Sequence, residues 1–392
     1  MAHDRSKNWQ FETTAIHSGR VPEDGTRSVT TPIYPSSTYR VDYPGDESGY
    51  VYARWKNPTR LALEETLAKL ERGTKAAAFA SGLAALDAVL KLLKTGDHVV
   101  AVDDLYGGTM RQFERIGRRF GLDFTYVDGR DPKNLESAIR PNTRLFWLET
   151  PTNPLMHLVD IEKVAAVAKE RGILVGVDNT FATPYLQQPL ELGADIVLHS
   201  MTKYLGGHCD LVAGALIVKD SSLGEQLWFN QYAGGAHLGP WESWLVLRGL
   251  KTLALRMERH SVNAMKIAEY LETVEAVEKV YFPGLDGRPV PNRMRLPGGM
   301  VAFTIAPQFD FEAVKRFVMA LRVFVLAESL GGVESLVNHP AAMTHSSIPR
   351  EIREPRGITD GLVRLSVGIE HIDDLLIDLR SAFDALTQSA RA

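Results

Sequence analysis

The lysine in the most unusual setting of the sequence is Lys203, which follows an apolar run at 196–198 in the stretch SMTK (200–203), just ahead of two glycines. A lysine on the solvated surface needs no such setting. A buried lysine, in contrast, loses its charge readily and becomes an imine-forming nucleophile. We therefore predict that Lys203 lies in a site and carries out covalent chemistry there.

Three further stretches place polar or aromatic residues where an apolar, strand-like run ends. Asp178 ends the run ILVGVD (173–178), where a carboxylate either serves a catalytic site or merely caps a helix. Ser81 opens a helix through a small-residue turn whose free N–H groups could hold a phosphate. Tyr106 lies in DDLYGG (103–108), which either presents an aromatic ring or is simply a surface loop.

Together these residues match the needs of one cofactor, pyridoxal 5'-phosphate (PLP). Its site requires an imine-forming lysine, a carboxylate that keeps the pyridine nitrogen protonated, an aromatic plate and a phosphate cradle. Lys203, Asp178 and Tyr106 supply the first three. The sequence lacks the motifs GxGxxG, HExxH and GxSxG and a P-loop, which weakens dehydrogenase, zinc-protease, serine-hydrolase and kinase interpretations. The residues of the candidate cradle are Gly82, Leu83, Ser200 and Thr202.

The elements that position these residues alternate along the chain. From Tyr52 onward, apolar runs of strand length are interleaved with segments of helical period, which predicts an α/β fold with a parallel sheet and crossover helices. Ligands of such sheets lie beyond the carboxyl ends of the strands, where the candidate residues stand. A long helical stretch (250–271) then precedes a loop rich in Pro and Gly (283–299). The strand-like runs are 76–80, 98–102, 124–127, 145–148, 173–177, 196–198, 300–305, 323–327 and 363–367.

Length and composition indicate a folded protein of two domains. The 392 residues predict an N-terminal arm over 1–55, a large PLP-binding domain over 56–250 and a smaller C-terminal α/β domain over 251–392. A net charge of -4 offers no basic field to nucleic acid or anionic lipid. A single cysteine and the lack of a long apolar run predict a cytoplasmic protein without a membrane segment or a cysteine-rich metal site.

Ten ordered stretches carry a family resemblance: TPIYPSSTY (31–39), YARWKNPT (52–59), FASGLAAL (79–86), DDLYGGT (103–109), ETPTNP (149–154), VDNTFATPY (177–185), HSMTKYLGGH (199–208), RGLKTLALRME (248–258), LAESLGGVESL (326–336) and RLSVGIE (364–370). On these stretches the chain resembles the cystathionine γ-synthase and γ-lyase family of PLP-dependent trans-sulfuration enzymes. The resemblance implies the aspartate aminotransferase-like fold (PLP fold type I), with a mostly parallel seven-stranded sheet. It also implies a homotetramer, a dimer of dimers with shared active sites.

The resemblance also assigns residues to the cofactor and the substrate. Tyr52 and Arg54 would reach the phosphate of the neighbouring subunit, and Thr180 would contact the cofactor within one chain. Arg364 matches the arginine that grips the substrate α-carboxylate, a task suited to a planar guanidinium. Alternatively, Arg364 forms an ion pair on the surface of a strand. The residues implied to assist Arg364 are Asn153 and Ser329.

The implied reaction is a γ-elimination or γ-replacement on cystathionine or an activated homoserine. Lys203 would move the Cα proton as a general base, and Tyr106 would act as acid or base near the leaving group. Glu328 matches the acidic position beside the far end of the substrate in enzymes that handle cystathionine, although it could be a solvated charge. Gly108 stands where methionine γ-lyases typically carry a reactive cysteine.

Several activities remain open at this point. Cystathionine γ-lyase and γ-synthase fit the sequence about equally. Methionine γ-lyase, O-acylhomoserine sulfhydrylase and cystathionine β-lyase are alternatives within the family. A non-catalytic α/β binding protein that has kept the scaffold is the alternative from another class.

The chain departs from the family pattern at Met110, at Trp55 and in a shortened loop over 284–299. Trp55 either lines the entrance of the site or packs against other side chains. Cys209 is expected to be a small buried thiol. His199 is expected to be structural.

Overall fold

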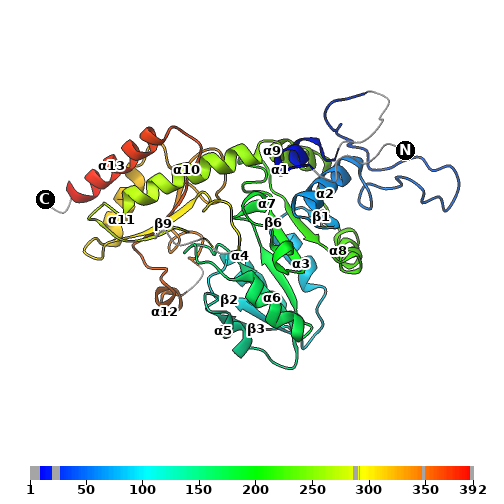
Figure 1. The fold of residues 1–392 in the computed structure, drawn as a ribbon, viewed down its shortest axis with the longest axis horizontal. Helices are drawn as coiled ribbons and strands as arrows, with labels where there is room; N and C mark the ends of the chain where they lie inside the picture. Colours follow the sequence, from blue (N-terminus) through cyan, green and yellow to red (C-terminus); the bar gives the residue numbers. More distant parts are fainter. Residues whose placement is uncertain (1–8, 20–26, 286–289, 291, 347–348, 389–392) are drawn as a thin grey trace.

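The structure is a computed structural model that describes residues 9–19, 27–285, 290, 292–346 and 349–388. Its elements form two sheets with helices packed against them, and the two sheets lie side by side (Figure 1). Helix α10 (Leu253–Leu271) connects the two sheets with their helices. It contacts α1 (Phe11–His17) and α7 (Thr183–Leu186) on one side and two strands of the second sheet on the other.

The first sheet has seven strands in the order β1-β7-β6-β5-β4-β2-β3. Five neighbouring strands are parallel, and β7 runs antiparallel to both β1 and β6. Every residue of β2 and β7 is buried, as expected for strands covered on both faces. The bounds are β1 Lys75–Phe79, β2 His98–Val102, β3 Asp123–Val127, β4 Thr143–Glu149, β5 Leu174–Asp178, β6 Ile196–Ser200 and β7 Gly214–Val218.

Helices cover this sheet through two apolar clusters. One cluster joins the strands to α3, α4 and α6, and the other joins β1 and β7 to α2, α9 and α10. Gly176 of β5 leaves room for the fully buried Trp147 of β4, since a Cβ there would lie 2.7 Å from the indole ring. The remaining bounds are α2 Pro58–Leu70, α3 Gly82–Leu90, α4 Gly107–Arg115, η2 Gly117–Phe120, α5 Pro132–Ser137, α6 Ile161–Glu170, η3 Pro189–Leu192, α8 Ser221–Gly234 and α9 Pro240–Leu250.

The second sheet has five strands in the order β10-β11-β12-β9-β8, antiparallel apart from the β10–β11 pair. Three aromatic rings of its core lie together, with Phe317 4.6 Å from Phe383 and 6.0 Å from Phe303. The bounds are β8 Val277–Tyr281, β9 Met300–Ile305, α11 Phe311–Ala320, β10 Val325–Leu326, β11 Leu336–Asn338, α12 Arg350–Arg353, η4 Glu354–Arg356, β12 Leu362–Ser366 and α13 Ile372–Gln388.

The segment before α2 extends away from the body of the molecule (Figure 1). Within this segment, the main chains of Thr38 and Tyr52 form an isolated antiparallel bridge. Helix α1, which lies within the predicted arm, instead packs on its own chain, where Phe11 is buried 5.2 Å from the ring of Tyr185. The division at residues 55 and 250 into arm and two domains stays a prediction.

The predicted α/β fold with a mostly parallel seven-stranded sheet is confirmed, but some elements differ from expectation. The predicted helix over 250–271 is broken between Leu250 and Leu253, and the strand predicted over 323–327 is only Val325–Leu326. Strands β7, β8 and β11 were not predicted. Part of the loop 284–299, at 286–289 and 291, lies outside the described residues.

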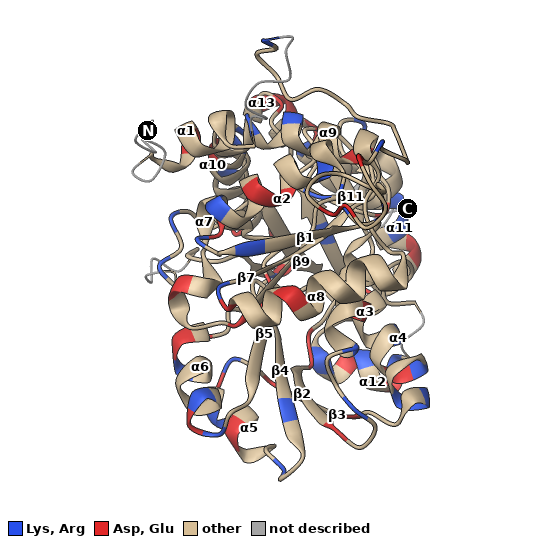
Figure 2. Ribbon diagram, turned by 90° about the vertical axis from the view of Figure 1, so that its right-hand side faces the viewer, with Lys and Arg blue, Asp and Glu red and all other residues tan. Residues whose placement is uncertain are grey.

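Acidic and basic residues are interspersed over the helices and loops (Figure 2). No helix within the described ranges is long and apolar enough to cross a membrane. The same part of the chain contains no cluster of three or more His, Cys, Asp or Glu side chains that could hold a metal ion.

Candidate active site

The carboxyl ends of three parallel strands form the floor of a cavity of about 430 Å³. Strands β4, β5 and β6 end at Glu149, Asp178 and Ser200, and all three residues line the cavity. This is the edge at which ligands of open parallel sheets bind. Twelve of the fourteen predicted site residues meet here: Gly82, Leu83, Tyr106, Asn153, Asp178, Thr180, Ser200, Thr202, Lys203, Glu328, Ser329 and Arg364.

One end of the cavity is formed by the start of α3. The Ser81 hydroxyl caps this helix by accepting the N–H of Ala84 at 3.1 Å, and the first N–H groups of a helix have no partner within the helix. A Cβ at Gly82 would lie 3.1 Å from Cβ of Ser200, so glycine allows the helix start to approach β6 closely. The main-chain N–H groups of Gly82 and Leu83 therefore face a cradle suited to a phosphate.

Hydroxyl groups complete this end of the cavity. Thr180 accepts a hydrogen bond from the N–H of Ser200 at 2.9 Å, which ties the loop after β5 to the end of β6. Thr202 exchanges two hydrogen bonds with the main chain of Ala213, at 3.0 and 3.2 Å. The Ser200 hydroxyl has no hydrogen-bond partner among the residues described and lines the cavity. It is free to bind a ligand.

Lys203 lies in the loop after β6 and faces the second half of the molecule. Its Nζ donates a hydrogen bond to the hydroxyl of Ser329 at 2.7 Å. Burial lowers the pKa of Lys203 to about 8, and the positive charge of Arg364 adds to the effect. A substantial neutral fraction near physiological pH makes this lysine a nucleophile and a general base.

Ser329 is held in a strained conformation, with φ at +85°. Its loop packs directly on the lysine segment, since a Cβ at Gly331 would lie 2.7 Å from the main-chain N of Tyr204. The carbonyl of Ser329 accepts a hydrogen bond from Nη2 of Arg364 at 3.1 Å. The strained serine thus connects the amine of Lys203 with the guanidinium of Arg364.

Arg364 is a buried residue of β12, with 2% of its surface exposed. Its Nη1 donates to Oδ1 of Asn153 at 2.6 Å, while the buried Nε has no partner in the described structure. Burial lowers the pKa of Arg364 to about 10, so the group remains charged at neutral pH. A fixed cation with an unused donor is suited to a carboxylate ligand.

Asp178 stands at the end of β5 and accepts a hydrogen bond from the N–H of Thr180 at 3.0 Å. Burial raises its pKa, which the hydrogen bonds from Thr180 and the charges of His199 and Lys203 oppose. A half-buried carboxylate of this kind is stabilised as an anion by a cationic ring nitrogen placed beside it.

Glu149 was missed in the sequence analysis, although it obeys the same rule as Asp178 and directly follows the apolar run 145–148. It is 4% exposed and pairs in register with Asp178 on the adjacent parallel strand. Its Oε2 accepts the main-chain N–H of Tyr106 at 3.0 Å. Burial, with the charge of Asp178, raises the pKa of Glu149 well above its ordinary value.

Tyr106 and Glu328 line the more open part of the cavity. The Tyr106 side chain is 41% exposed, and burial of its phenol raises the pKa. A Cβ at Gly108 would lie 2.3 Å from the Tyr106 ring, so a glycine is needed for this ring position. Glu328 is exposed, and its negative charge acts on both Tyr106 and Arg364.

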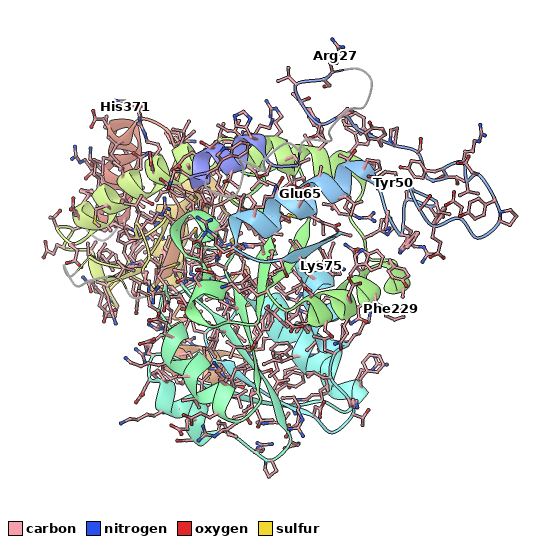
Figure 3. The ribbon with its side chains drawn as sticks, turned by 45° about the vertical axis from the view of Figure 1, so that its right-hand side comes forward. Arg27, Tyr50, Glu65, Lys75, Phe229 and His371 are labelled. Atoms are coloured by element: carbon pink, nitrogen blue, oxygen red, sulfur yellow. The ribbon has the colours of Figure 1, made fainter. Side chains whose placement is uncertain are left out.

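The structure does not bring Tyr52 and Arg54 to the cavity of their own chain. Tyr52 is 45% exposed, and Arg54 donates a hydrogen bond to the carbonyl of Tyr232 at 2.9 Å. Both stand a few residues before α2 in the chain. Tyr50 and, on α8, Phe229 lie on the same side of the molecule (Figure 3). A role for Tyr52 and Arg54 in a neighbouring subunit stays a prediction.

The expectation of a buried Cys209 is wrong, whereas Trp55 takes the packing role that was one of its two alternatives. Cys209 is exposed rather than buried, and its φ of +55° places it in a tight turn. Trp55 packs 6.2 Å from Trp228 with Lys56 over its ring, and it does not line the cavity. Thr344, from the loop after β11, was not predicted to reach the site but lines it.

The residues present fit PLP in both shape and donor set. The glycine-lined start of α3 and the free Ser200 hydroxyl suit a phosphate, and the cavity lies between Asp178 and Lys203. A buried cationic Arg364 with an unpaired Nε suits a substrate carboxylate in the same cavity.

Comparison with known proteins points the same way. A family profile described as Cys/Met metabolism PLP-dependent enzyme matches residues 12–384. The chain is 51% identical to a cystathionine β-lyase of Lactococcus lactis subsp. cremoris, over 95% of this chain and 99% of that protein. It is 47% identical to a cystathionine γ-synthase/O-acetylhomoserine (thiol)-lyase of Bacillus subtilis, over 97% and 98%. The crystal structure of a cystathionine γ-lyase from Lactobacillus plantarum complexed with L-serine is 46% identical and superposes with a TM-score of 0.93, covering 97% of this chain and 100% of that one.

Proposed function

Because the chain belongs to the family of Cys/Met metabolism PLP-dependent enzymes, we propose that it catalyses elimination or replacement at Cγ of cystathionine or an activated homoserine. The supporting observation is the chain of contacts from Lys203 through Ser329 to Arg364. An amine with a lowered pKa and a buried guanidinium joined in this way fix where the Cα and carboxylate of an amino acid would lie.

PLP supplies an electron sink for the electrons left at Cα when its proton departs. We propose that Lys203 attaches the cofactor covalently, that Asp178 pairs with its ring nitrogen, and that Tyr106 stacks on its ring. The residues proposed to hold its phosphate from within the chain are Gly82, Leu83, Thr180, Ser200 and Thr202.

The proposed proton transfers use two residues. Lys203, with a pKa lowered to about 8 by burial, accepts the Cα proton as a general base. The phenol of Tyr106, whose pKa is raised by burial, stays protonated at neutral pH and donates to the leaving group. Arg364 and Asn153 hold the substrate carboxylate, and Glu328 faces the far end of the substrate.

The glycine at position 108 argues against a methionine γ-lyase. The reactive cysteine expected there in such enzymes requires a Cβ, and a Cβ would lie 2.3 Å from the Tyr106 ring as it is placed. Tyr106 would have to move away from its present position. The proposal therefore favours cystathionine over methionine as the thioether.

Cystathionine β-lyase is the second candidate, because a relative with that name is 51% identical over nearly the whole chain. The two lyases cut opposite sides of the same sulfur atom. Cleavage at Cγ gives cysteine, 2-oxobutanoate and ammonia, whereas cleavage at Cβ gives homocysteine, pyruvate and ammonia, with one water consumed in each case.

Identification of the products separates these reactions. Purified enzyme loaded with PLP is incubated with cystathionine, and separately with an O-acylhomoserine plus cysteine, and a Lys203→Ala variant controls for contaminating activity. We expect 2-oxobutanoate in the first reaction or cystathionine in the second. Pyruvate as the sole keto acid, together with no product from the acylhomoserine, would replace the proposal with β-lyase activity.

We also propose that the enzyme is a homotetramer, a dimer of dimers in which Tyr52 and Arg54 reach the phosphate in the partner's site. Support comes from their position outside their own cavity and from exposed apolar side chains on the arm and nearby elements (Figure 3). The exposed apolar side chains are Tyr43, Tyr50, Val212, Phe229 and Trp241.

A cytoplasmic location completes the proposal. It is supported by the single, exposed cysteine, which gives the chain no intramolecular disulfide.

A further inference from the structure

Glu149 is the one buried carboxylate in the cavity to which the proposed function gives no task. It is 4% exposed, it lines the cavity, and it stands beside Asp178 at the ends of adjacent parallel strands. Adjacent strands lie about 4.8 Å apart, so the two carboxyl groups leave the sheet side by side. A second acid so close to the one proposed for the cofactor needs a physical reason.

The contact that Glu149 makes leads to Tyr106. Its Oε2 accepts the main-chain N–H of Tyr106 at 3.0 Å, and this amide is the one just before helix α4 begins. Tyr106 is the N-cap residue of α4, and its side chain makes no capping hydrogen bond to the helix. The carboxyl group of Glu149 therefore fixes the residue whose ring forms one wall of the cavity.

From this geometry we infer that Glu149 is a positioning residue, which holds the Tyr106 main chain, and thereby its ring, over the cofactor. The inference rests on the proposed function for the identity of what Tyr106 covers. It assigns no proton transfer to Glu149. Its partner in the task is Gly108, which leaves the space that the ring occupies.

The surroundings indicate that Glu149 does this as an uncharged acid. It forms no ion pair with a described residue, and the charges that act on it are those of Asp178 and Asp104, which are like charges, and of Arg364, which opposes them. Burial and the neighbouring Asp178 raise its pKa, which favours the protonated form. An uncharged Glu149 leaves the negative charge of the pair on Asp178.

If Glu149 acts as an uncharged acceptor, glutamine can replace it. Glu149→Gln keeps an uncharged acceptor of nearly the same shape, whereas Glu149→Ala removes the acceptor from the Tyr106 amide. The two variants are compared by titrating the cofactor-free proteins with PLP and recording the visible absorption of the bound cofactor. We expect the Kd of Glu149→Ala for PLP to rise roughly tenfold, the scale of one lost buried hydrogen bond, and the absorption band to change. Glu149→Gln should recover most of both effects.

A double-mutant cycle tests whether the effect passes through Tyr106. In a Tyr106→Ala background, Glu149→Ala should weaken PLP binding by no more than about twofold, because the ring that Glu149 positions is already absent. Additive losses would overturn the inference, since they would mean that Glu149 contacts the cofactor directly. A Glu149→Gln variant as damaged as Glu149→Ala would also overturn it, because an ionised carboxylate would then be required.

Loss of stability alone is excluded by a matched control. Asp378 is a second buried carboxylate that accepts main-chain N–H groups, namely those of Arg322, Val323 and Phe324. It lies on α13 and does not line the cavity. Asp378→Ala should lower the thermal stability of the cofactor-free protein and leave the Kd for PLP unchanged. A Glu149→Ala protein that behaved like this control would refute the positioning role.

The outcome is separable from that of the proposed function. If the wild-type protein binds PLP but converts no cystathionine and no acylhomoserine, the proposed reaction fails while the comparison of Glu149 variants still stands. If the wild-type protein turns over cystathionine and Glu149→Ala matches it in Kd and spectrum, only the inference about Glu149 fails.

Discussion

At the scale of single residues, the site depends on charged groups taken out of water. Lys203, Asp178, Glu149 and Arg364 all have pKa values displaced by burial, and each is placed where a ligand charge or proton would offset that displacement. Strain at Ser329 is confined to the contact between Lys203 and Arg364.

The lowered pKa of Lys203 predicts a pH dependence of folding stability. Between about 8 and the ordinary value of 10.5, the unfolded chain binds more protons at this lysine than the folded one. Stability rises with pH wherever the unfolded state binds more protons, so the wild-type protein gains stability across this window. The charged and titratable groups that act on the pKa of Lys203 are Arg364, Cys209, Asp178 and Glu328.

Urea unfolding of the cofactor-free protein measures this effect. A Lys203→Met variant lacks the titrating group, and we expect its stability advantage over wild type to shrink by up to about 3 kcal/mol between pH 8 and pH 10.5. A stability difference that stays constant over this range would show that burial does not shift the lysine.

Residue patterns in the sequence predicted much of the site. Asp178 ends one apolar strand and Lys203 stands three residues after another, and parallel strands must end at a common edge, so their meeting could be predicted. Glu149 satisfies the same rule and could have been found. Thr344 could not, because it belongs to the loop after β11 of the second sheet, and no strand-end rule for the first sheet predicts that this loop reaches the cavity.

At the scale of elements, the site is assembled from the ends of β4, β5 and β6, the starts of α3 and α4, the loops after β10 and β11, and strand β12. The sequence predicted the parallel strands well, because their continuous apolar runs reflect burial on both faces. Strand β7 has an equally apolar run, but its antiparallel direction depends on the path of the chain through the Lys203 loop. Gly249, in the last turn of α9, precedes the break at Lys251 and Thr252, but it is a weak signal because a single glycine is tolerated inside a helix.

The close approach of α3 to β6 leads to a prediction about Gly82. A Cβ in Gly82→Ala would lie 3.1 Å from Cβ of Ser200 and push the helix start away from the cradle. We expect the Kd for PLP to rise roughly tenfold, the scale of one hydrogen bond lost between the displaced helix start and the phosphate.

A second helical glycine provides the control for this substitution. In Gly234→Ala the new Cβ would meet only the flexible end of Lys91, 3.4 Å away, and PLP binding should be unchanged. Titration of both cofactor-free variants with PLP makes the comparison. Wild-type affinity in Gly82→Ala would contradict the role given to the start of α3.

At the scale of the whole molecule, the cavity of one chain lacks two of the residues expected to complete it. Tyr52 and Arg54 lie outside, on a segment that extends from the body (Figure 1). A chain of this shape suits an assembly in which each arm covers a neighbouring site. Local sequence patterns identify the arm but do not determine which chain it contacts.

Mixing two inactive variants tests this sharing of sites. Arg54→Ala lacks the arm contact, and Lys203→Ala lacks the attachment lysine, so each alone should have little activity. Refolded or co-expressed together, they should form hybrids in which one site has both residues intact, with about a quarter of all sites active. A mixture as inactive as its parents, despite proven hybrid assembly, would show that each chain completes its own site.

Borohydride trapping shows whether Lys203 carries PLP. The purified protein, supplied with PLP, should be yellow. Borohydride should bleach the visible band, and peptide mass mapping should find the reduced cofactor on the peptide that contains Lys203. A protein that stays colourless with added PLP, or a label found on another lysine, would contradict the account.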